Sequence, residues 1–313
     1  MEKDLKTKSY LSDPGRFADL INGVMCAGKE IVAPEELHDM DSYTGTFYWT
    51  GVKDKKGSGQ RYRDLVKKAA FGINFMVIGI ENQEEVHYLM PLRCMAYDVG
   101  EYERQAVKIR KKVRKQKGIS SAEFLSGFTK ESLLQPCVTI VVYYGKNWDG
   151  ARDLYSILDF TNIPEELKNV VNNYRIHICE VRKFINTDVF RTDLKQVFDC
   201  IRFADDKESL YELIMKDPDY KELDEKAYDV IAEYVDADEF MDVKKCIQEG
   251  ETVNMGSAFK EIMQDARKEG QIEAIIETSR EFGAAREDTV ERLMRKVQLS
   301  EEEAKEYLEK YWP

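Results

Sequence analysis

The sequence has few histidines, no closely spaced cysteines and no long hydrophobic run. Its six cysteines lie at positions 26, 94, 137, 179, 200 and 246, so no Cys-x-x-Cys pair occurs, and the three histidines are equally scattered. This spacing argues against a zinc site, which takes its ligands from closely spaced cysteine and histidine pairs. A chain of 313 residues can also bury a full core without a disulfide framework. We therefore expect reduced, mostly buried thiols.

No apolar segment reaches the roughly 18 residues that a membrane-spanning helix requires. The longest candidate, residues 71–80, is interrupted by glycine and asparagine and is more typical of a β-strand. The first residues, Met-Glu-Lys-Asp-Leu-Lys, lead into no apolar stretch, which is not typical of a secretory signal. These features predict a cytoplasmic protein without a membrane partner.

Positive charge is scarcer than negative charge. There are 47 Lys and Arg residues against 59 Asp and Glu residues, which gives a net charge of −12. This balance argues mildly against a nucleic-acid partner, although a whole-chain sum can hide a basic face. Between Glu103 and Glu123 no acidic residue occurs, and cations recur there at helical spacing, namely Arg104, Lys108, Lys111, Lys112 and Lys115.

This cationic segment has two interpretations. It could lie along the backbone of double-stranded DNA, where lysine and arginine side chains displace condensed counterions. It could equally be a solvated helix face, which is the usual role of a charge run. Arg93 likewise has two possible roles, because it could contact a phosphate or form an ion pair within the fold.

The apolar pattern predicts an α/β fold. Asp13 and Pro14 are typical of a helix start, and this helix should end near Gly28. Strands at residues 64–70 and 75–80 should form a hairpin. Further expected elements are a strand at 46–50, a helix from 91 to about 117, a central strand at 137–144 covered on both faces, a strand at 174–181, and helices at 151–158 and 192–203.

From about residue 204 the strand signals end and helical periodicity continues. We place a domain boundary there, between a core at residues 1–203 and a C-terminal all-helical region at residues 204–313. Ser300 and Glu303 form a capping box that starts the last helix. The apolar residues of this region could dock onto the core or mediate a homo-oligomer, and the candidates are Ile272, Ile275, Ile276 and Phe282.

Three polar residues flank the predicted hairpin. Asp64 stands at the start of its first strand and Glu81 at the end of its second. Pairing would bring these carboxylates together at one sheet edge, and Gln83 would face the same way as Glu81. Two convergent carboxylates repel each other unless a cation lies between them, and oxygen ligands suit Mg²⁺ or Mn²⁺. The alternative is a pair of surface carboxylates at strand ends.

Six stretches, in order between residues 16 and 150, carry a family resemblance. They are Arg16-Phe-Ala-Asp-Leu-Ile-Asn22, Arg63-Asp-Leu-Val-Lys-Lys68, Gly79-Ile-Glu-Asn-Gln83, Met90-Pro-Leu-Arg-Cys-Met-Ala-Tyr-Asp98, Phe124-Leu-Ser-Gly-Phe128 and Tyr143-Tyr-Gly-Lys-Asn-Trp-Asp-Gly150. With these stretches the sequence resembles the recombination-promoting nucleases, also labelled transposases, of the PD-(D/E)XK nuclease superfamily.

The resemblance implies a restriction-endonuclease-like mixed β-sheet flanked by helices, acting on DNA. It implies Asp64 and Glu81 as metal ligands, and Gln83 at the position that lysine holds in many such nucleases. Glutamine is a departure, because it can hold a water molecule but cannot act as a base at neutral pH. Many of these nucleases also use an acid from the first helix. Here Asp19 falls almost opposite the apolar stripe of its helix, and we expect it to be a solvated charge.

Two functional hypotheses follow. The first is a magnesium-dependent DNA endonuclease that hydrolyses phosphodiester bonds and promotes recombination or mobile-element activity. The second is a catalytically degenerate nuclease fold that acts as a DNA-binding or protein-interaction module, which Gln83 and the acidic balance favour. Calorimetry with magnesium or manganese discriminates between them, because only the first requires a bound metal.

Overall fold

The computed structural model describes residues 2–40, 43–47, 59–62, 64–71, 74–235 and 252–312. The chain divides into two compact units. Residues 1–210 with 226–236 form the first unit, and residues 211–225 with 237–313 form the second. The boundary expected between residues 203 and 204 lies close to the first crossing between the units, and most of helix α8 (Glu225–Val235) groups with the first unit.

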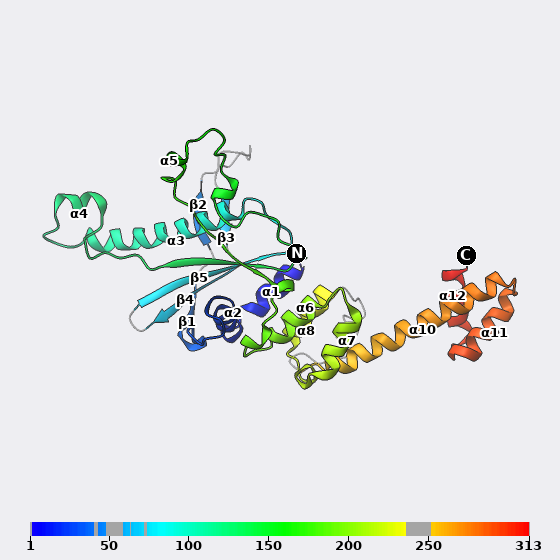
Figure 1. The fold of residues 1–313 in the computed structure, drawn as a ribbon. Coiled ribbons are helices and arrows are strands. Elements are labelled where there is room, and N and C mark those ends of the chain that lie inside the picture. Colours follow the sequence, from blue (N-terminus) through cyan, green and yellow to red (C-terminus); the bar gives the residue numbers. More distant parts are fainter. Residues whose placement is uncertain are drawn as a thin grey trace. The chain divides into compact units, whose positions relative to one another are not determined.

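A five-stranded mixed sheet lies at the centre of the first unit (Figure 1). Its strands, in spatial order, are β1 (Leu37–Asp39), β4 (Leu65–Phe71), β5 (Asn74–Gln83), β6 (Cys137–Tyr143) and β7 (His177–Glu180). The first three strands pair antiparallel, whereas β5, β6 and β7 pair parallel. The mixed sheet and the β4–β5 hairpin are therefore confirmed, although residues 72 and 73 of its link lie outside the described residues.

The middle of the sheet is covered on both faces. Consecutive side chains of β5 and β6 are almost fully buried, although they point to opposite faces, as Ile140, Val141 and Val142 show with 0% exposure. A strand that is buried on both faces has no polar alternation, and this is why the apolar run predicts a central strand correctly. A separate ladder pairs β2 (Tyr43–Phe47) with β3 (Gly59–Tyr62). The strand predicted at residues 46–50 overlaps β2, and residues 48–50 lie outside the described part.

Helices flank the sheet on both sides. On one face, Met90 and Cys94 of α3 (Met90–Val113) pack in one cluster with Val141 of β6. On the opposite face, the buried ammonium group of Lys67 lies 5.6 Å from the ring centre of Phe17 in α2 (Pro14–Cys26). Figure 1 shows α3 and α2 on opposite sides of β4 and β5. The other helices of this unit include α1 (Glu2–Leu11), α4 (Ser121–Ser126), α5 (Glu165–Lys168) and α6 (Leu194–Arg202), and α7 (Lys207–Lys216) crosses into the second unit.

Short 3₁₀ turns complete the connections. They are η1 (Pro34–Glu36), η2 (Tyr155–Ile157), η3 (Val181–Lys183), η4 (Thr187–Val189) and η5 (Pro218–Lys221). The helix predicted at residues 151–158 is wrong, since only η2 forms there. The backbone of this segment bonds instead to a distant one, because the Leu154 N–H donates to the Tyr174 carbonyl at 2.9 Å. Propensity alone cannot show such a long-range partner.

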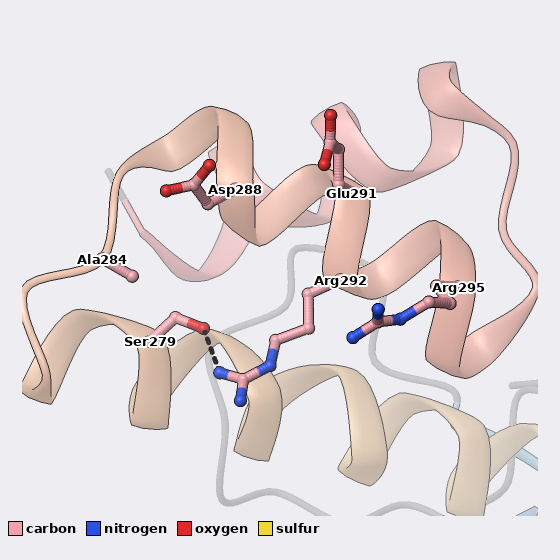
Figure 2. A pocket seen from close by; sticks show the side chains of 6 residues that line it. All are labelled: Ser279, Ala284, Asp288, Glu291, Arg292 and Arg295. Carbon is pink, nitrogen blue, oxygen red and sulfur yellow. Dashed lines mark hydrogen bonds between the residues drawn. The ribbon is translucent and has the colours of Figure 1, made fainter.

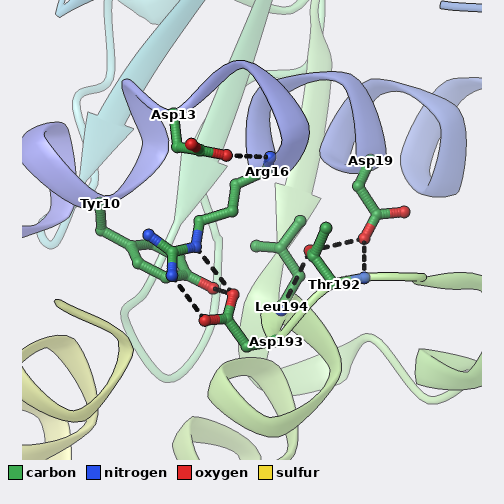
Figure 3. Close-up of polar contacts among 7 residues, drawn as sticks. All are labelled: Tyr10, Asp13, Arg16, Asp19, Thr192, Asp193 and Leu194. Atoms are coloured by element: carbon green, nitrogen blue, oxygen red, sulfur yellow. Dashed lines mark hydrogen bonds and ion pairs between the residues drawn. The ribbon is translucent and has the colours of Figure 1, made fainter. Parts of the chain in front are cut away.

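Asp19 corrects another expectation. Its side chain is buried and accepts hydrogen bonds of 2.7 to 3.0 Å from the backbone N–H groups of Arg191 and Thr192 and from the Thr192 hydroxyl. Figure 3 shows the bonds between Asp19 and Thr192. One turn earlier, Arg16 forms a bidentate ion pair with Asp193. Asp19 is therefore not a solvated charge, because it fastens α2 to the segment that leads into α6. The helical wheel places Asp19 away from the apolar stripe but cannot show that another segment packs there.

We expect Asp19→Ala to lower the free energy of unfolding by about 2–4 kcal/mol, because several donors lose a charged acceptor in a buried place. Asp19→Asn should cost less, since the amide oxygen still accepts. Urea denaturation measures both. Glu35→Ala is the control, because it removes an exposed acid that lies in η1. An Asp19→Ala protein that is as stable as the wild type would show that these bonds do not hold α2 in place.

Three helices form the C-terminal part of the second unit. They are α10 (Met255–Glu281), α11 (Arg286–Val297) and α12 (Glu301–Tyr311). The Ser300–Glu303 capping box at the start of α12 is confirmed. Ile272 and Ile276 are fully buried in a cluster with apolar residues of α11 and α12, and Ile275 packs against it. These three residues are therefore covered within the unit, whereas Phe282 is 83% exposed.

A recess of about 240 Å³ lies between α10 and α11 (Figure 2). A guanidinium nitrogen of Arg292 lies 3.5 Å from the Ser279 hydroxyl on its floor. Two acids and two arginines line the recess together, namely Asp288, Glu291, Arg292 and Arg295. Because their charges offset each other, the recess favours neither anions nor cations.

None of the helices in the described part of the chain combines the length and apolarity that a bilayer crossing needs.

Candidate active site

The carboxyl end of β5 brings the predicted acids together. Leu65 pairs with Ile80 in the antiparallel ladder, so Asp64 and Glu81 stand at the next opposed positions and belong to the same face. The backbone N–H of Asn82 donates to a carboxylate oxygen of Asp64 at 2.7 Å. The hairpin register thus sets the two residues at opposed positions, and both side chains line one cavity.

Gln83 lies on the same face as Glu81. Its amide nitrogen is 2.7 Å from the Asn82 carbonyl and 3.4 Å from Glu81 Oε1. The side chain is half-buried, whereas Glu81 is only 1% exposed. Because its amide nitrogen points inward, the carbonyl oxygen of the same amide is the atom with which Gln83 could hold a ligand or a water molecule.

Helix α3 supplies a cation to this centre. Arg93, in the first turn of α3, forms an ion pair with Glu81 and donates a 2.8 Å hydrogen bond to the Tyr97 hydroxyl. That hydroxyl lies 3.4 Å from Glu81 Oε1. Burial opposes the charge of the guanidinium, but Glu81 and Tyr97 outweigh burial and raise the pKa of Arg93. Of the two roles that the sequence leaves open for Arg93, the structure shows the ion pair.

A cavity of about 250 Å³ opens at this point. Four carboxylates and one guanidinium line it, together with three other residues, and the complete lining is Asp4, Asp64, Glu81, Asn82, Gln83, Glu84, Arg93 and Tyr234. The cavity is therefore strongly negative. Such an excess of carboxylate oxygens favours a cation, and it disfavours an anion that arrives without one.

Asp4 is a site residue that the sequence pattern does not predict. It lies on α1, a helix whose apolar spacing is too sparse to stand out. The signal in the sequence is the helical spacing of Thr7, Tyr10 and Leu11, which are neighbours on one helix face and are buried in the structure. Asp4 is exposed, and its charge raises the pKa of Asp64. An acid from the first helix is thus present at the site, on α1 rather than on α2.

Asp64 has a perturbed ionisation. Burial raises the pKa of its carboxyl, the hydrogen bond from Asn82 lowers it, and the charge of Asp4 raises it further. The net effect is a pKa above the ordinary value for aspartate. A carboxylate that is held in such surroundings gains more than an exposed one from a cation placed against it.

This shift has a defined effect on stability without divalent metal. Because the folded state raises the pKa of Asp64, ionising this group costs folding free energy. The cost is absent below the unfolded pKa of about 3.9, where both states are protonated, and it appears as the pH rises through the folded pKa. We therefore expect Asp64→Asn to be more stable than the wild type at pH 7 in EDTA, with the difference fading toward pH 3.5. Urea denaturation over this pH range measures it, and a less stable variant at pH 7 would contradict the sign.

The donor atoms fit a hard divalent ion. In the described residues, no three His, Cys, Asp or Glu side chains are close enough to hold a metal on their own. Mg²⁺ does not need them, because proteins commonly supply one or two carboxylates and leave the other positions to water and substrate phosphates. Asp64 and Glu81 meet this requirement, and Asp4 and Glu84 add negative charge nearby. The residues therefore suit Mg²⁺ or Mn²⁺ in the presence of a phosphate ligand.

A second cavity of about 500 Å³ adjoins the first and shares Glu84 and Tyr234 with it. Four cations contribute to its lining, namely Lys3, Lys146, Arg182 and Lys207. Lys146 and Arg182 both approach one oxygen of Asp205, at 2.9 and 3.3 Å. The space beside the carboxylates is therefore less negative than the site itself, and it is large enough to admit part of a substrate.

The predicted cations of α3 have different environments. Arg104 is half-buried and ion-paired with Glu101 at 2.6 Å. Three lysines follow it in the helix with exposed side chains, namely Lys108, Lys111 and Lys112, and Lys115 is exposed just after the helix end. Within the described residues, no acidic side chain pairs with these four lysines. The structure therefore leaves four of the predicted phosphate contacts available and engages Arg93 and Arg104 internally.

Comparison with known proteins adds no relative to this description. No family model matches the chain, and no curated protein or solved structure is similar enough to be identified as related.

Proposed function

We propose that this protein is a metal-dependent DNA endonuclease with a restriction-endonuclease-like core. The observation that carries the proposal is the meeting of Asp64 and Glu81 at the carboxyl end of β5, in a cavity lined by four carboxylates. Glu81 is buried and Asp64 is half-buried, and negative charge in such places is costly to a fold unless it has a use. A divalent cation and a phosphodiester together supply that use.

The residues have distinct roles in this proposal. Asp64 and Glu81 would hold Mg²⁺ or Mn²⁺, and Asp4 would add negative charge from α1. When bound, such an ion polarises the phosphate and lowers the pKa of a water molecule. Gln83 would orient the attacking water by hydrogen bonds, because its amide cannot take a proton at neutral pH.

Arg93 would change partners when substrate arrives. It now neutralises Glu81, and its side chain is 29% exposed, so it can reach an incoming ligand. A guanidinium fits a phosphate in two-pronged geometry as well as it fits a carboxylate. As a cation engages Glu81, Arg93 would turn to the phosphate and steady its charge.

The order of elements supports the same class. An antiparallel hairpin that continues into parallel strands, with one acid just before its first strand and one near the end of its second, is compatible with the restriction-endonuclease-like arrangement that the sequence resemblance implies. The resemblance to recombination-promoting nucleases suggests recombination or mobile-element activity in the cytoplasm as the setting.

Plasmid nicking tests the proposal. We expect conversion of supercoiled DNA to open circles with Mg²⁺ or Mn²⁺, complete loss of this activity with excess EDTA, and recovery when the metal is restored. Isothermal titration should show metal binding that strengthens when a short duplex is present, since phosphate oxygens complete the ligand set. A protein that neither binds metal nor nicks DNA would refute the hydrolytic function.

One observation favours the second candidate, a non-catalytic DNA-binding module. The ion pair with Arg93 occupies the Glu81 oxygen that also contacts Gln83 and Tyr97, so the charge of Glu81 is offset without any metal, although its other oxygen, Oε2, is buried without a hydrogen-bond partner. In that case DNA should bind equally well with and without Mg²⁺, and no nicking should occur with either metal.

A further inference from the structure

Helix α3 joins the candidate site to the exposed cations. Arg93 lies in its first turn and lines the carboxylate cavity. Lys108 and Lys111 lie near its other end and are exposed. One continuous helix thus sets the distance between the site and these lysines, and Figure 1 shows it running from the region of β3 to α4.

The spacing places these cations on one face of the helix. At about 100° per residue, Lys111 falls in line with Arg93 and Lys108 lies about 60° away. Arg104 falls between them in angle, but its ion pair with Glu101 removes it from the available set. The side chains of Arg93, Lys108 and Lys111 therefore project toward a common side of α3.

Distances along α3 can be expressed as numbers of base pairs of a duplex that lies beside it. A rise of about 1.5 Å per residue puts Lys108 about 22 Å and Lys111 about 27 Å from Arg93 along the axis. Base pairs are stacked about 3.4 Å apart, so these distances correspond to about 6–8 base pairs. The exposed Lys115, just after the helix end, extends the reach to about 10 base pairs, which is one turn of the duplex.

We infer that α3 acts as a cationic ruler for double-stranded DNA, which contacts the duplex about 6–10 base pairs to one side of the phosphate that is cut. The inference rests on the proposed nuclease function. Charge indicates DNA as the partner of this surface, because no acid in the described part of the chain pairs with the lysines at this end of α3 and the sequence has no acid between residues 103 and 123, in a protein whose net charge is −12. Stiffness indicates double-stranded rather than single-stranded DNA, because a duplex stays straight over ten base pairs and a single strand does not.

Mapping of cut positions tests the ruler. An end-labelled duplex of 40 base pairs is digested briefly with Mg²⁺, and the cuts in each strand are located on a sequencing gel. We expect cuts to be missing from about 6–10 base pairs at one end of each strand, with the same polarity on both strands, and to approach the other end more closely. Single strands of the same sequence should show no such zone.

The variant Lys108→Gln/Lys111→Gln should lose the protected zone and cut about tenfold or more slowly near 0.1 M salt. Lys29→Gln is the matched control, because it removes an equally exposed lysine just after α2, on the other side of the sheet. Equal cutting at both ends by the wild type, or a protected zone that persists in the double variant, would overturn the ruler. Circular dichroism shows whether the variants are folded.

A binding measurement separates this inference from the proposed function. Without metal, the double variant should reduce the slope of log Kd against log salt by about 2 on duplexes of 16 base pairs or more, and by less on duplexes of 8 base pairs. If neither the wild type nor any variant cuts DNA, the proposed nuclease function is refuted. A change in salt slope that depends on duplex length would still support α3 as the element that contacts the duplex. An unchanged slope at all lengths would show that the lysines form only a solvated face.

Discussion

Asp64→Asn and Glu81→Gln should each reduce metal-dependent nicking of plasmid DNA by about 10²–10³-fold. A bound metal contributes several kcal/mol of transition-state stabilisation, and each 1.4 kcal/mol corresponds to a factor of ten in rate. Both substitutions keep the shape of the side chain and remove the charge that holds the cation. Initial rates of open-circle formation at saturating Mg²⁺ measure the effect.

The control for this result is Glu35→Gln. Glu35 is exposed and lines neither the carboxylate cavity nor the cavity beside it. Its substitution removes the same charge and should leave the rate within about twofold, as surface substitutions usually do. Stability does not confound the comparison at Asp64, because its amide variant should be more stable than the wild type at pH 7 in EDTA. Full activity in Asp64→Asn or Glu81→Gln would remove that residue from the mechanism.

Arg93→Met should lower the free energy of unfolding by about 3–5 kcal/mol without metal, because it leaves the carboxylate of Glu81 buried without its cation. In the double variant Glu81→Gln/Arg93→Met the loss should be smaller than the sum of the single losses by about 1–3 kcal/mol. Urea denaturation of the four proteins in EDTA gives this double-mutant cycle.

Magnesium provides a second measurement on the same pair. If Glu81 holds a cation, Mg²⁺ can take the place of the guanidinium. It should then raise the Tm of Arg93→Met more than the Tm of the wild type, because binding to the folded state alone is stabilising. Calcium offers a non-hydrolytic control with the same charge. A Tm that is insensitive to either ion in all four proteins would favour the module over the enzyme, whatever the size of the coupling.

The Asp19 and Asp64 predictions separate two kinds of buried acid. Asp19 accepts several hydrogen bonds and should stabilise the fold as a carboxylate. Asp64 accepts a backbone hydrogen bond from Asn82, feels the negative charge of Asp4, and should cost stability when ionised. The presence of an acid that destabilises the fold, in a cavity that other acids line, is better explained by ligand binding than by a contribution to folding.

Local patterns were sufficient for much of the sheet and for the central pair of acids. The short apolar runs at β5 and β6 are continuous and rich in β-branched residues, as is typical of strands covered on both faces, and a tight link between two such strands predicts a hairpin. Asp64 and Glu81 therefore had to become neighbours once the hairpin formed. The cation spacing on α3 is similarly a property of one helix and follows from 3.6 residues per turn.

Contacts between distant segments produced the other features of the site. Asp4 reaches the cavity because α1 packs near the end of β5, Arg93 faces Glu81 because α3 crosses that face of the sheet, and Asp19 is buried because residues 191 and 192 return to α2. Periodicity reports the conformation of a segment, since backbone geometry repeats along the chain. Packing between distant segments decides which charges are buried and which partners they have, and no local period encodes this packing. It added Asp4 and Arg93 to the cavity that Asp64 and Glu81 line.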